Sequence, residues 1–333
     1  MKIDTAIQKV FFRADAGLQI GYGHFIRTLA LADMLRDDFD CTFFTQSPSE
    51  YQQREAEKVC PLVALPSDDN KFEKFLDYLS GEEIVVLDNY FFTTEYQQQI
   101  REKGCKLVCL DGMTTKHYVS DILINQSLDV SRPDFSLEEY TILNTGLQYA
   151  LLRKPFLNKS IQPKREINPP FNIVICFGGA DMYNLTDKVI SQLNEEKKVG
   201  NITTIVGDAY HCSLSHQNVC YRRNLSAEEM ADVIFKSDIA ILPSSTVLKE
   251  ALACKIYIIS GYFVDNQIQT YNAYLDNNLI CGVGDFTVPA AMKKLSEIIN
   301  TGVFYSTKPE NCKIDGLIPQ RYINMFKNLS ICK

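Results

Sequence analysis

The stretch FFRADAGLQIGYGHFIRTLALADML, residues 11–35, decides the fold predicted for this chain. It opens with the apolar pair Phe11 and Phe12, typical of the end of a buried strand, and continues through a loop with three glycines. From Phe25 onward, apolar residues recur at the spacing of an amphipathic helix. This order puts His24 at or just before a helix N-terminus, at the carboxyl edge of a parallel sheet, where open α/β proteins bind ligands.

The pattern around His24 is compatible with a functional role and equally with a structural one. A histidine at this position exchanges a proton near neutral pH, and Gly21 and Gly23 leave the backbone open to a ligand. The alternative is a histidine that caps the helix or packs inside without any chemistry. The glycines do not form the dinucleotide fingerprint G-x-G-x-x-G, because position 26 is Ile26. A nicotinamide enzyme is therefore disfavoured.

Length and composition indicate two soluble domains. The chain has 333 residues, 46% of them hydrophobic and 23% charged, which is enough to bury two cores. A formal net charge of −7 and the lack of a basic cluster disfavour nucleic acid and anionic membranes as partners. The first residues lack the apolar core of a signal peptide, and no run of 18 apolar residues occurs. We therefore expect a cytoplasmic protein.

The cysteines point to the same compartment. They number eleven, which is odd, and no two of them form a C-x-x-C pair. Most lie in apolar runs such as KLVCLD and IVICFGG, where a thiol behaves as a small hydrophobic group. A disulfide framework or a zinc site is not expected.

The first half of the sequence alternates buried strands with helices, which predicts one parallel sheet built from βαβ units. Expected strands are 40–46, 82–90, 105–112 and 121–127, and expected helices are 24–36, 70–80 and 95–104. Polar residues close the strands and should share one edge of the sheet with His24; they are Asp15, Asp88, Asn89, Tyr90, Asp111 and Asn125. Each alone is explained as a turn or cap residue. Together, beside a histidine loop, they are as compatible with a lined pocket.

The second half repeats this pattern after a linker rich in proline and charge at 158–170. Strand, loop and helix recur from 171 onward, and Ser226 with Glu229 has the spacing of a capping box. We predict an α/β protein of two Rossmann-like domains, residues 1–158 and 159–333, facing a central cleft that suits a ligand.

Two loops of the second half suit a phosphorylated ligand. Ser244, Ser245 and Thr246 follow a buried strand and begin a helix, so their hydroxyls and amides can hold phosphate. Glu250 lies one turn further on the same face and can accept hydrogen bonds from ribose hydroxyls. The alternative is an ordinary N-cap followed by a solvated glutamate. The loop GGAD, residues 178–181, offers backbone amides to an anion but lacks the Lys-Ser/Thr of a Walker loop.

These motifs, in this order, resemble the nucleotide-sugar enzymes of the GT-B fold. The closest resemblance is to the UDP-2,4-diacetamido-2,4,6-trideoxy-β-L-altropyranose hydrolase family of pseudaminic acid biosynthesis. The matching stretches cover nearly the whole chain and are FRADAGLQIGYGHFIRTLALA, VVLDNY, DILIN, LQYALLRKPF, FGGAD, SSTVLKEAL, DNQIQTYNAYL and IDGLIPQRYIN. The sequence departs from the family at Asn89, where histidine can occur, and at Ala180, where threonine is common, which bears on the sugar.

The resemblance implies a role for each matching residue. His24 is the implied catalytic base, with Asp15, Gly21, Gly23, Asn89 and Tyr90 orienting it or contacting the sugar. The implied UDP-binding residues are Gly178, Gly179, Asp181, Ser244, Ser245, Thr246, Glu250, Asn266 and Gln267. No HExxH motif occurs, so we expect a metal-free mechanism. We also expect a monomer that uses no cofactor and acts on a UDP-sugar.

The implied reaction is inverting hydrolysis at the anomeric carbon, with water activated by His24 and UDP leaving. Two alternatives stay open because fold alone does not fix function. The first is a GT-B glycosyltransferase with a UDP-N-acetylhexosamine-type donor, in which His24 activates an acceptor hydroxyl. The second is a non-catalytic UDP-sugar-binding protein, which would need Glu250 and the serine loop but not His24.

Overall fold

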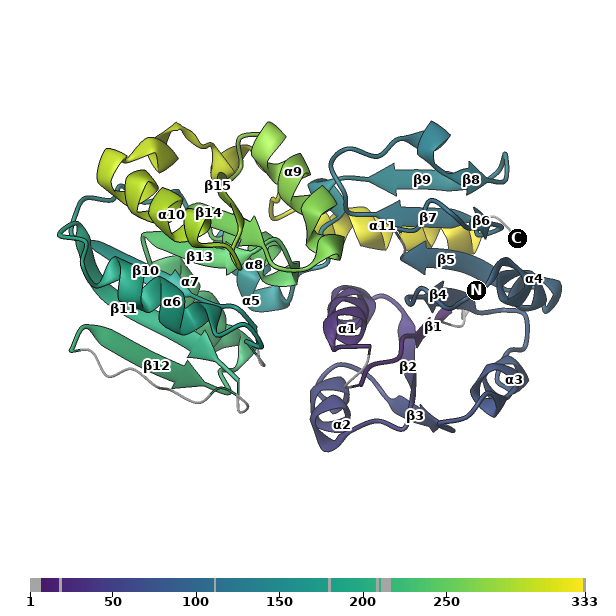
Figure 1. Cartoon of the computed structure of the whole chain (residues 1–333). Coiled ribbons are helices and arrows are strands. Elements are labelled where there is room, and N and C mark those ends of the chain that lie inside the picture. Colours follow the sequence, from purple (N-terminus) through teal and green to yellow (C-terminus); the bar gives the residue numbers. More distant parts are fainter. Residues whose placement is uncertain are drawn as a thin grey trace. The chain divides into compact units, whose positions relative to one another are not determined.

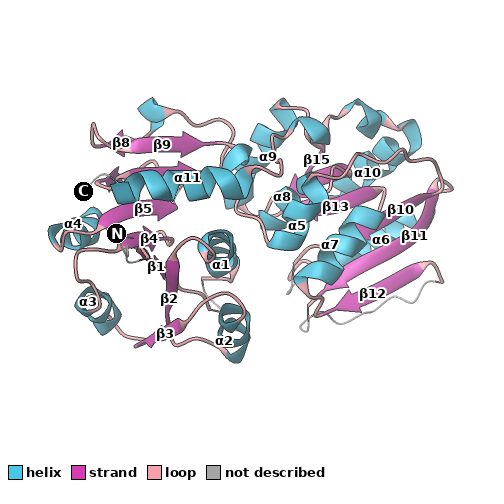
Figure 2. Cartoon of the chain, turned by 180° about the vertical axis from the view of Figure 1, so that it is seen from behind, coloured by secondary structure: helices cyan, strands magenta, loops and turns pink. Residues whose placement is uncertain are grey.

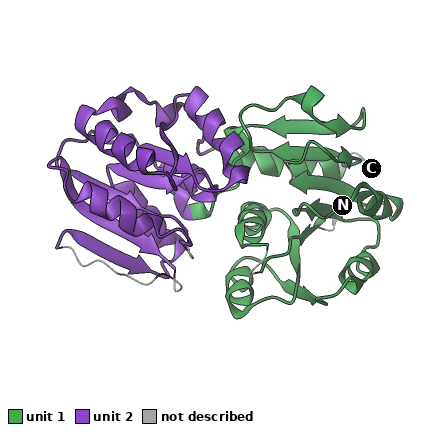
Figure 3. Cartoon of the chain, in the orientation of Figure 1, with its two compact units in different colours: residues 1–154, 317–333 green, residues 155–316 purple. Residues whose placement is uncertain are grey.

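The computed structural model describes residues 7–17, 20–110, 112–178, 181–207, 210 and 217–331. The chain divides into two compact units, residues 1–154 with 317–333 and residues 155–316 (Figure 3). Each unit is a parallel sheet covered by helices, so the prediction of two Rossmann-like α/β domains is confirmed.

The sheet of the first unit has seven parallel strands in the order β3-β2-β1-β4-β5-β7-β9 (Figure 1). In that order they are β3 (Leu62–Leu65), β2 (Asp40–Gln46), β1 (Lys9–Arg13), β4 (Ile84–Leu87), β5 (Lys106–Leu110), β7 (Ile122–Asn125) and β9 (Ile142–Thr145). All four residues of β4 are buried, as expected for a central strand covered on both faces. A separate short pair is formed by β6 (His117–Tyr118) and β8 (Ser136–Leu137).

Helices cover both faces of this sheet. They are α1 (Gly23–Leu35), α2 (Glu50–Glu57), α3 (Asn70–Asp77), α4 (Thr94–Glu102) and α11 (Ile318–Ile331), with 3-10 turns η1 (Arg132–Asp134) and η2 (Leu147–Tyr149). Apolar side chains of α3 and α4 share one core with alternate residues of the central strands. Helix α1 packs on β1 and β2 and against α11.

The last helix corrects the predicted domain boundaries, which assigned residues 159–333 to the second domain. The chain enters the second unit at residue 155 and returns to the first at 317. Helix α11 belongs to the first unit because its Tyr322 and Phe326 are fully buried there. The Tyr322 hydroxyl donates to the Tyr149 carbonyl at 2.6 Å, and the Phe326 ring packs on Phe39 with centroids 6.0 Å apart.

The sheet of the second unit has six parallel strands in the order β12-β11-β10-β13-β14-β15. In that order they are β12 (Val219–Arg223), β11 (Val199–Val206), β10 (Phe171–Ile175), β13 (Ile239–Pro243), β14 (Tyr257–Tyr262) and β15 (Cys281–Asp285). This is the strand order of the Rossmann sheet. The order in which the chain adds strands reverses between β10 and β13, and all strands stay parallel.

Two layers of helices enclose the second sheet. They are α5 (Lys154–Ser160), α6 (Leu185–Leu193), α7 (Ala227–Lys236), α8 (Thr246–Ala253), α9 (Ile268–Asp276) and α10 (Pro289–Thr301), with 3-10 turns η3 (Asp265–Gln267), η4 (Val303–Ser306) and η5 (Pro309–Asn311). Helices α6 and α10 share one core with the strands, while α7 and α8 pack together on the other face (Figure 2). The predicted capping box is present: Ser226 Oγ accepts from the Glu229 amide at 3.2 Å, and Glu229 Oε2 accepts from the Ser226 amide at 2.8 Å.

Candidate active site

Each sheet has a point where the strand order reverses, between β1 and β4 in the first unit and between β10 and β13 in the second. Open α/β sheets bind ligands at the carboxyl ends of the strands flanking such a point. The loops that follow these four strands begin at residues 14, 88, 176 and 244. Most of the predicted site residues lie in them or in the helices that follow them.

His24 lies in the first turn of α1 and is 8% exposed. Its Nδ1 is 2.7 Å from Oδ1 of Asp88, the residue that follows β4. An ionised carboxylate only accepts hydrogen bonds, so Nδ1 carries the hydrogen and Nε2 is left with its lone pair. No group in the described part of the chain contacts Nε2 by a hydrogen bond. This is the arrangement of an oriented general base.

Asp88 is fully buried and is held by donors from one face of α1. Arg27 Nε donates to Oδ2 at 2.6 Å, and Thr28 Oγ1 donates to the same oxygen at 2.8 Å. Burial alone would raise the pKa of the Asp88 carboxyl, but the Arg27 guanidinium and the hydrogen bonds from Arg27 and His24 outweigh it and lower that pKa. Asp88 is therefore a carboxylate when it faces His24.

Asp15 has other partners than those predicted. Its carboxylate is fully buried, pairs with both terminal nitrogens of Arg13, and accepts from the Gln46 amide at 2.8 Å. Lys71 Nζ lies 3.6 Å from it. Asp88, not Asp15, contacts the His24 ring, which corrects the expectation that Asp15 orients it.

Asn89 connects the two loops of the first unit. Its side chain accepts from the Asp15 amide at 2.7 Å and donates to the Asp15 carbonyl at 3.2 Å. Both residues are at most 3% exposed. The pair thus fixes the loop after β1 to the loop after β4, which keeps His24 and Asp88 in register.

Tyr90 and the two glycines lie around the histidine. The Tyr90 ring packs edge-on against the His24 ring with centroids 4.8 Å apart and is itself 55% exposed. Gly21 has a φ of 78°, and a Cβ there would meet no atom within 4 Å. Gly23 is the first residue of α1, whose N-cap Tyr22 makes no side-chain capping bond. Direct contact of these residues with a sugar stays a prediction.

The second unit has an open helix end after β13. Ser245 is the N-cap of α8 and makes no side-chain capping bond, and Thr246 is the first helical residue. The Ser244 hydroxyl is already paired, at 3.0 Å from Ser260 Oγ, and its amide donates to the Gly261 carbonyl at 2.9 Å. Among the three predicted phosphate-binding hydroxyls, those of Ser245 and Thr246 therefore have no partner within the described residues. Glu250 is 5% exposed in the same helix.

The loop after β10 is arranged differently. Asp181 closes the N-terminus of α6, because its Oδ1 accepts from the Leu185 amide at 2.8 Å and its Oδ2 from the Thr186 amide at 2.9 Å. A carboxylate at this place repels a diphosphate, which argues against the predicted contact of Asp181 with UDP. Gly178 has a φ of 87° with open space around it, whereas Gly179 lies outside the described residues, as does Asp111.

The two residues predicted in the loop after β14 are in the turn η3. Asn266 is exposed, and Gln267 is 8% exposed and accepts from the Phe263 amide at 3.1 Å. Gln267 is thus used by the protein itself, while Asn266 is accessible to a ligand. A nucleotide contact for either residue remains a prediction.

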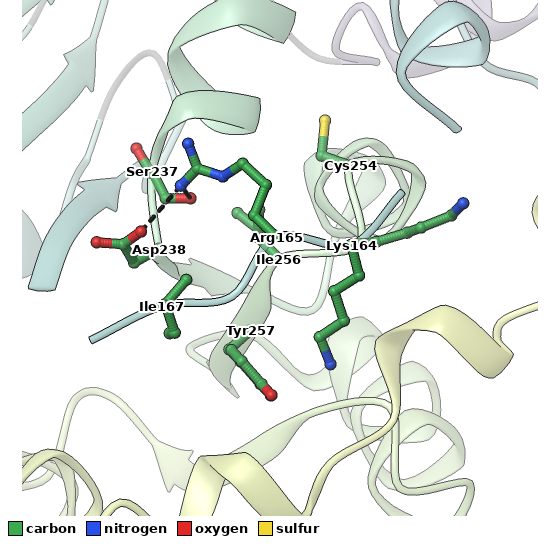
Figure 4. A pocket seen from close by; sticks show the side chains of 9 residues that line it. Lys164, Arg165, Ile167, Ser237, Asp238, Cys254, Ile256 and Tyr257 are labelled. Atoms are coloured by element: carbon green, nitrogen blue, oxygen red, sulfur yellow. Dashed lines mark hydrogen bonds and ion pairs between the residues drawn. The ribbon is translucent and has the colours of Figure 1, made fainter. Parts of the chain in front are cut away.

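Two cavities in the described part of the chain lie at the opposite, amino ends of the strands. One, of about 10 Å³, is lined by Arg165 and Asp238, 2.9 Å apart, and by the start of β14 (Figure 4). It has room for a single water. The other, of about 440 Å³, adjoins the starts of β4 and β5. Neither is lined by a predicted site residue, so the candidate site rests on the chemistry of its side chains.

The described residues contain no group of three or more His, Cys, Asp or Glu side chains arranged to hold a metal ion. The nine cysteines in the described ranges form no disulfide with one another, and burial raises the pKa of most of them, that of Cys60 to about 12. No helix in the described part is long and apolar enough to cross a bilayer.

Arg27 and Thr28 were missed as site residues from the sequence, and Asp88 was noted only as one of several polar strand ends. The signal was present: Arg27 and Thr28 lie three and four residues after His24, hence on the same helix face. A carboxylate ending the strand beside β1 was the natural partner for all three.

Comparison with known proteins gives relatives for this chain, although no family model matches it. The UDP-2,4-diacetamido-2,4,6-trideoxy-beta-L-altropyranose hydrolase of Campylobacter jejuni is 26% identical over 79% of this chain and 94% of its own length. The spore coat polysaccharide biosynthesis protein SpsG of Bacillus subtilis is 23% identical over 81% of this chain and 82% of its own. An uncharacterized protein of Methanocaldococcus jannaschii is 26% identical over 80% of this chain, but the match spans only 58% of that protein.

Solved structures share the fold at low identity. MurG of Acinetobacter baumannii superposes with a TM-score of 0.63 and 12% identity over 96% of this chain and 99% of its own. MnaA of S. aureus, solved with UDP, gives a TM-score of 0.65 and 11% identity over 97% of each chain. The two Rossmann-like units thus form the GT-B fold, and the resemblance predicted from the sequence is confirmed: this chain is a relative of the Campylobacter jejuni UDP-sugar hydrolase.

Proposed function

We propose that this protein is a hydrolase of a UDP-activated amino-deoxysugar, which it cleaves at the anomeric carbon to release UDP and the free sugar. The observation that carries the proposal is His24, held by Asp88 through Nδ1 at 2.7 Å with Nε2 left to accept a proton. The similarity to the Campylobacter jejuni hydrolase supports the same reaction.

The second unit is the proposed nucleotide site. The amide end of α8, with the hydroxyls of Ser245 and Thr246, would bind the diphosphate, and Glu250 would accept hydrogen bonds from the ribose. Gly178 and Asn266 would complete it from the neighbouring loops. The fold similarity to a protein solved with UDP is consistent with this assignment.

The first unit would supply the base. Water attacks the anomeric carbon while its proton passes to Nε2 of His24; the bond from that carbon to the phosphate oxygen breaks and UDP leaves with the electron pair. Asp88 stabilises the imidazolium that forms. Attack from the face opposite UDP inverts the anomeric centre. This scheme needs no metal ion, because the helix amides stabilise the charge on the leaving diphosphate.

The resemblance of the sequence motifs also supports a place in nonulosonic acid biosynthesis of the pseudaminic type as part of this proposal. The free 2,4-diacetamido sugar would be the product passed on. The relative from Bacillus subtilis belongs by its name to spore coat polysaccharide biosynthesis, so a sugar precursor of a polysaccharide is the alternative substrate.

The test is UDP release from UDP-sugars in the absence of any acceptor. We expect the wild-type protein to release UDP and His24→Ala to be slower by about 10²- to 10⁴-fold, the contribution of a general base. The matched control is His117→Ala, since His117 lies in the same unit on the surface and contacts Ser136 and Glu138. Equal loss in both variants would contradict the proposal.

Isotope labelling locates the bond that breaks. In H₂¹⁸O, attack at the anomeric carbon puts the label in the sugar, whereas attack on phosphorus puts it in the released nucleotide. The proton spectrum of the product, taken before mutarotation, reports inversion or retention. Label in UDP would exclude the proposed step. UDP release only with an added acceptor would instead identify a glycosyltransferase, and UDP binding without release a non-catalytic protein.

A further inference from the structure

One turn of α1 directs three side chains at the same carboxylate. His24, Arg27 and Thr28 are spaced i, i+3 and i+4 and therefore share a helix face. Asp88 Oδ1 faces Nδ1 of His24 and also accepts from Arg27 Nη2, while Oδ2 accepts from Arg27 Nε and Thr28 Oγ1. Arg27 is the one cation among these donors, and its fork grips both oxygens.

We propose that Arg27 is a positioning residue for His24: by holding Asp88 ionised and fixed in plane, it commits the ring to the Nδ1–H tautomer and leaves Nε2 as the base. The inference deepens the proposed function and rests on it for its catalytic consequence. The structural part, the choice of tautomer, stands on the geometry alone.

The charge of Arg27 matters because Asp88 is fully buried. A carboxylate removed from water and left with neutral donors alone takes up a proton. A protonated Asp88 would donate to Nδ1, and the neutral ring would then carry its hydrogen on Nε2. In that state His24 has no lone pair to offer to a water at Nε2.

The distances assign the hydrogen in the native arrangement. Nδ1 is 2.7 Å from Asp88 Oδ1 and 3.1 Å from Arg27 Nη2. His24 Nδ1 and Arg27 Nη2 both donate to Asp88 Oδ1, and two donors to one oxygen lie close to each other. If Nδ1 carried no hydrogen, its lone pair would face the negative Oδ1 at 2.7 Å, which is unfavourable. Arg27 Nη2 also lies 3.4 Å from the carbonyl of Leu110, the last residue of β5, which limits its movement.

The experiment reads the tautomer directly, by ¹⁵N NMR of protein labelled at histidine and with the ring neutral. The four histidines are assigned with single substitutions. We expect Nδ1–H in the wild type and in Thr28→Val, which removes a neutral donor only. In Arg27→Met, which keeps the aliphatic stem but not the charge, we expect Nε2–H to predominate. Asp88→Asn serves as the reference for a reversed ring, since its amide can donate to Nδ1.

Kinetics with the UDP-sugar provide the second readout. Arg27→Met should lower kcat by roughly 10²-fold, the lower end of a general base contribution, with KM changed less than about threefold. Arg27→Lys keeps the charge and should restore part of kcat. Arg101→Met is the matched control: Arg101 pairs with Asp121 at 2.7 Å in the same unit, so it should leave the tautomer and kcat unchanged.

The outcomes separate this inference from the proposed function. A folded Arg27→Met protein that keeps Nδ1–H overturns the inference, whatever its activity. If that variant does not fold, Arg27→Lys takes its place. Lysine keeps the charge but cannot bind both oxygens of Asp88, so the inference then predicts a mixture of the two tautomers. If Arg27→Met shows the reversed tautomer but the wild type releases no UDP, the positioning role is supported and the proposed hydrolase function is contradicted.

Discussion

The two sheets follow the same strand order, but their carboxyl edges differ in side chains: ion pairs lie at the first edge and hydroxyl groups at the central loop of the second. In the first unit, Arg13, Asp15 and Asp88 are wholly buried; Arg13 forms an ion pair with Asp15, and Arg27 forms one with Asp88. In the second, the central loop presents Ser245 and Thr246 at the start of α8, and this helix has no acidic residue in its first turn. One edge has its charges already paired, while the other leaves the positive end of a helix available.

This difference matches the two tasks of the proposed reaction. A base must be held in one orientation, and a buried ionic network does this because each member fixes the next. An anion must be bound reversibly, and neutral donors with an uncompensated helix end do this without a resident counter-ion. The predictions below test this contrast, starting with the largest expected effect.

Removal of one charge from the first edge should strongly lower the stability of the protein. Asp15→Ala leaves the buried Arg13 guanidinium without its carboxylate and should lower the free energy of unfolding by about 3–5 kcal/mol. The measurement is urea unfolding followed by circular dichroism, because the chain has no tryptophan. The control is Asp77→Ala, whose side chain is 60% exposed and 3.5 Å from Lys74, with an expected loss under about 1 kcal/mol. Equal losses would contradict a buried network.

At the second edge the same kind of change should affect binding and spare stability. Thr246→Val removes a hydroxyl from the start of α8 and should weaken UDP binding by roughly 10- to 100-fold, the worth of a hydrogen bond to a charged group. Calorimetric titration with UDP measures it. Ser226→Ala is the reciprocal control: it removes the cap of α7, so stability should fall by about 1 kcal/mol with unchanged UDP affinity.

The two helix N-termini at the second edge differ: Asp181 caps that of α6, whereas that of α8 has no side-chain cap. Because Asp181 caps α6 through both oxygens, Asp181→Ala should lower the free energy of unfolding by about 0.5–2 kcal/mol. UDP affinity should stay equal or rise slightly, since a negative charge is lost. Thermal unfolding and calorimetric titration of one variant measure both. A tenfold loss of UDP affinity would return Asp181 to the nucleotide site.

The contrast was only partly readable from the sequence. Hydrophobic periodicity and the alternation of strands with helices predicted the two parallel sheets, and the strand–loop–helix order around residues 11–35 put His24 at the right edge. These features depend on local pattern. The return of α11 to the first unit was missed because it depends on long-range packing of Tyr322 and Phe326.

The pairing of side chains at the edges was readable only in part: the spacing of His24, Arg27 and Thr28 puts them on one helix face but does not say which carboxylate they contact. Asp15, Asp88 and Asp181 all follow strands, and this position alone does not distinguish the one that pairs with Arg13, the one that orients a histidine and the one that caps a helix. Their roles depend on which element contributes the partner: strand β2 through Gln46 for Asp15, helix α1 for Asp88 and the next helix along the chain for Asp181. Only the fold supplies that information.

The smallest expected effect concerns acid stability of the first edge. The pKa of Asp88 is lower in the folded protein than in the unfolded chain, where it is about 3.9. Its stabilising contribution is therefore complete above that value and is lost as the pH falls toward the folded pKa. The free energy of unfolding of Asp88→Asn should vary less steeply with pH below about 4, by at most one proton or about 1.4 kcal/mol per pH unit. Ser244→Ala, which removes a neutral hydroxyl at the second edge, should keep the wild-type slope. An unchanged slope in Asp88→Asn would mean that Asp88 is not held as a carboxylate, and the orientation of His24 would then need another cause.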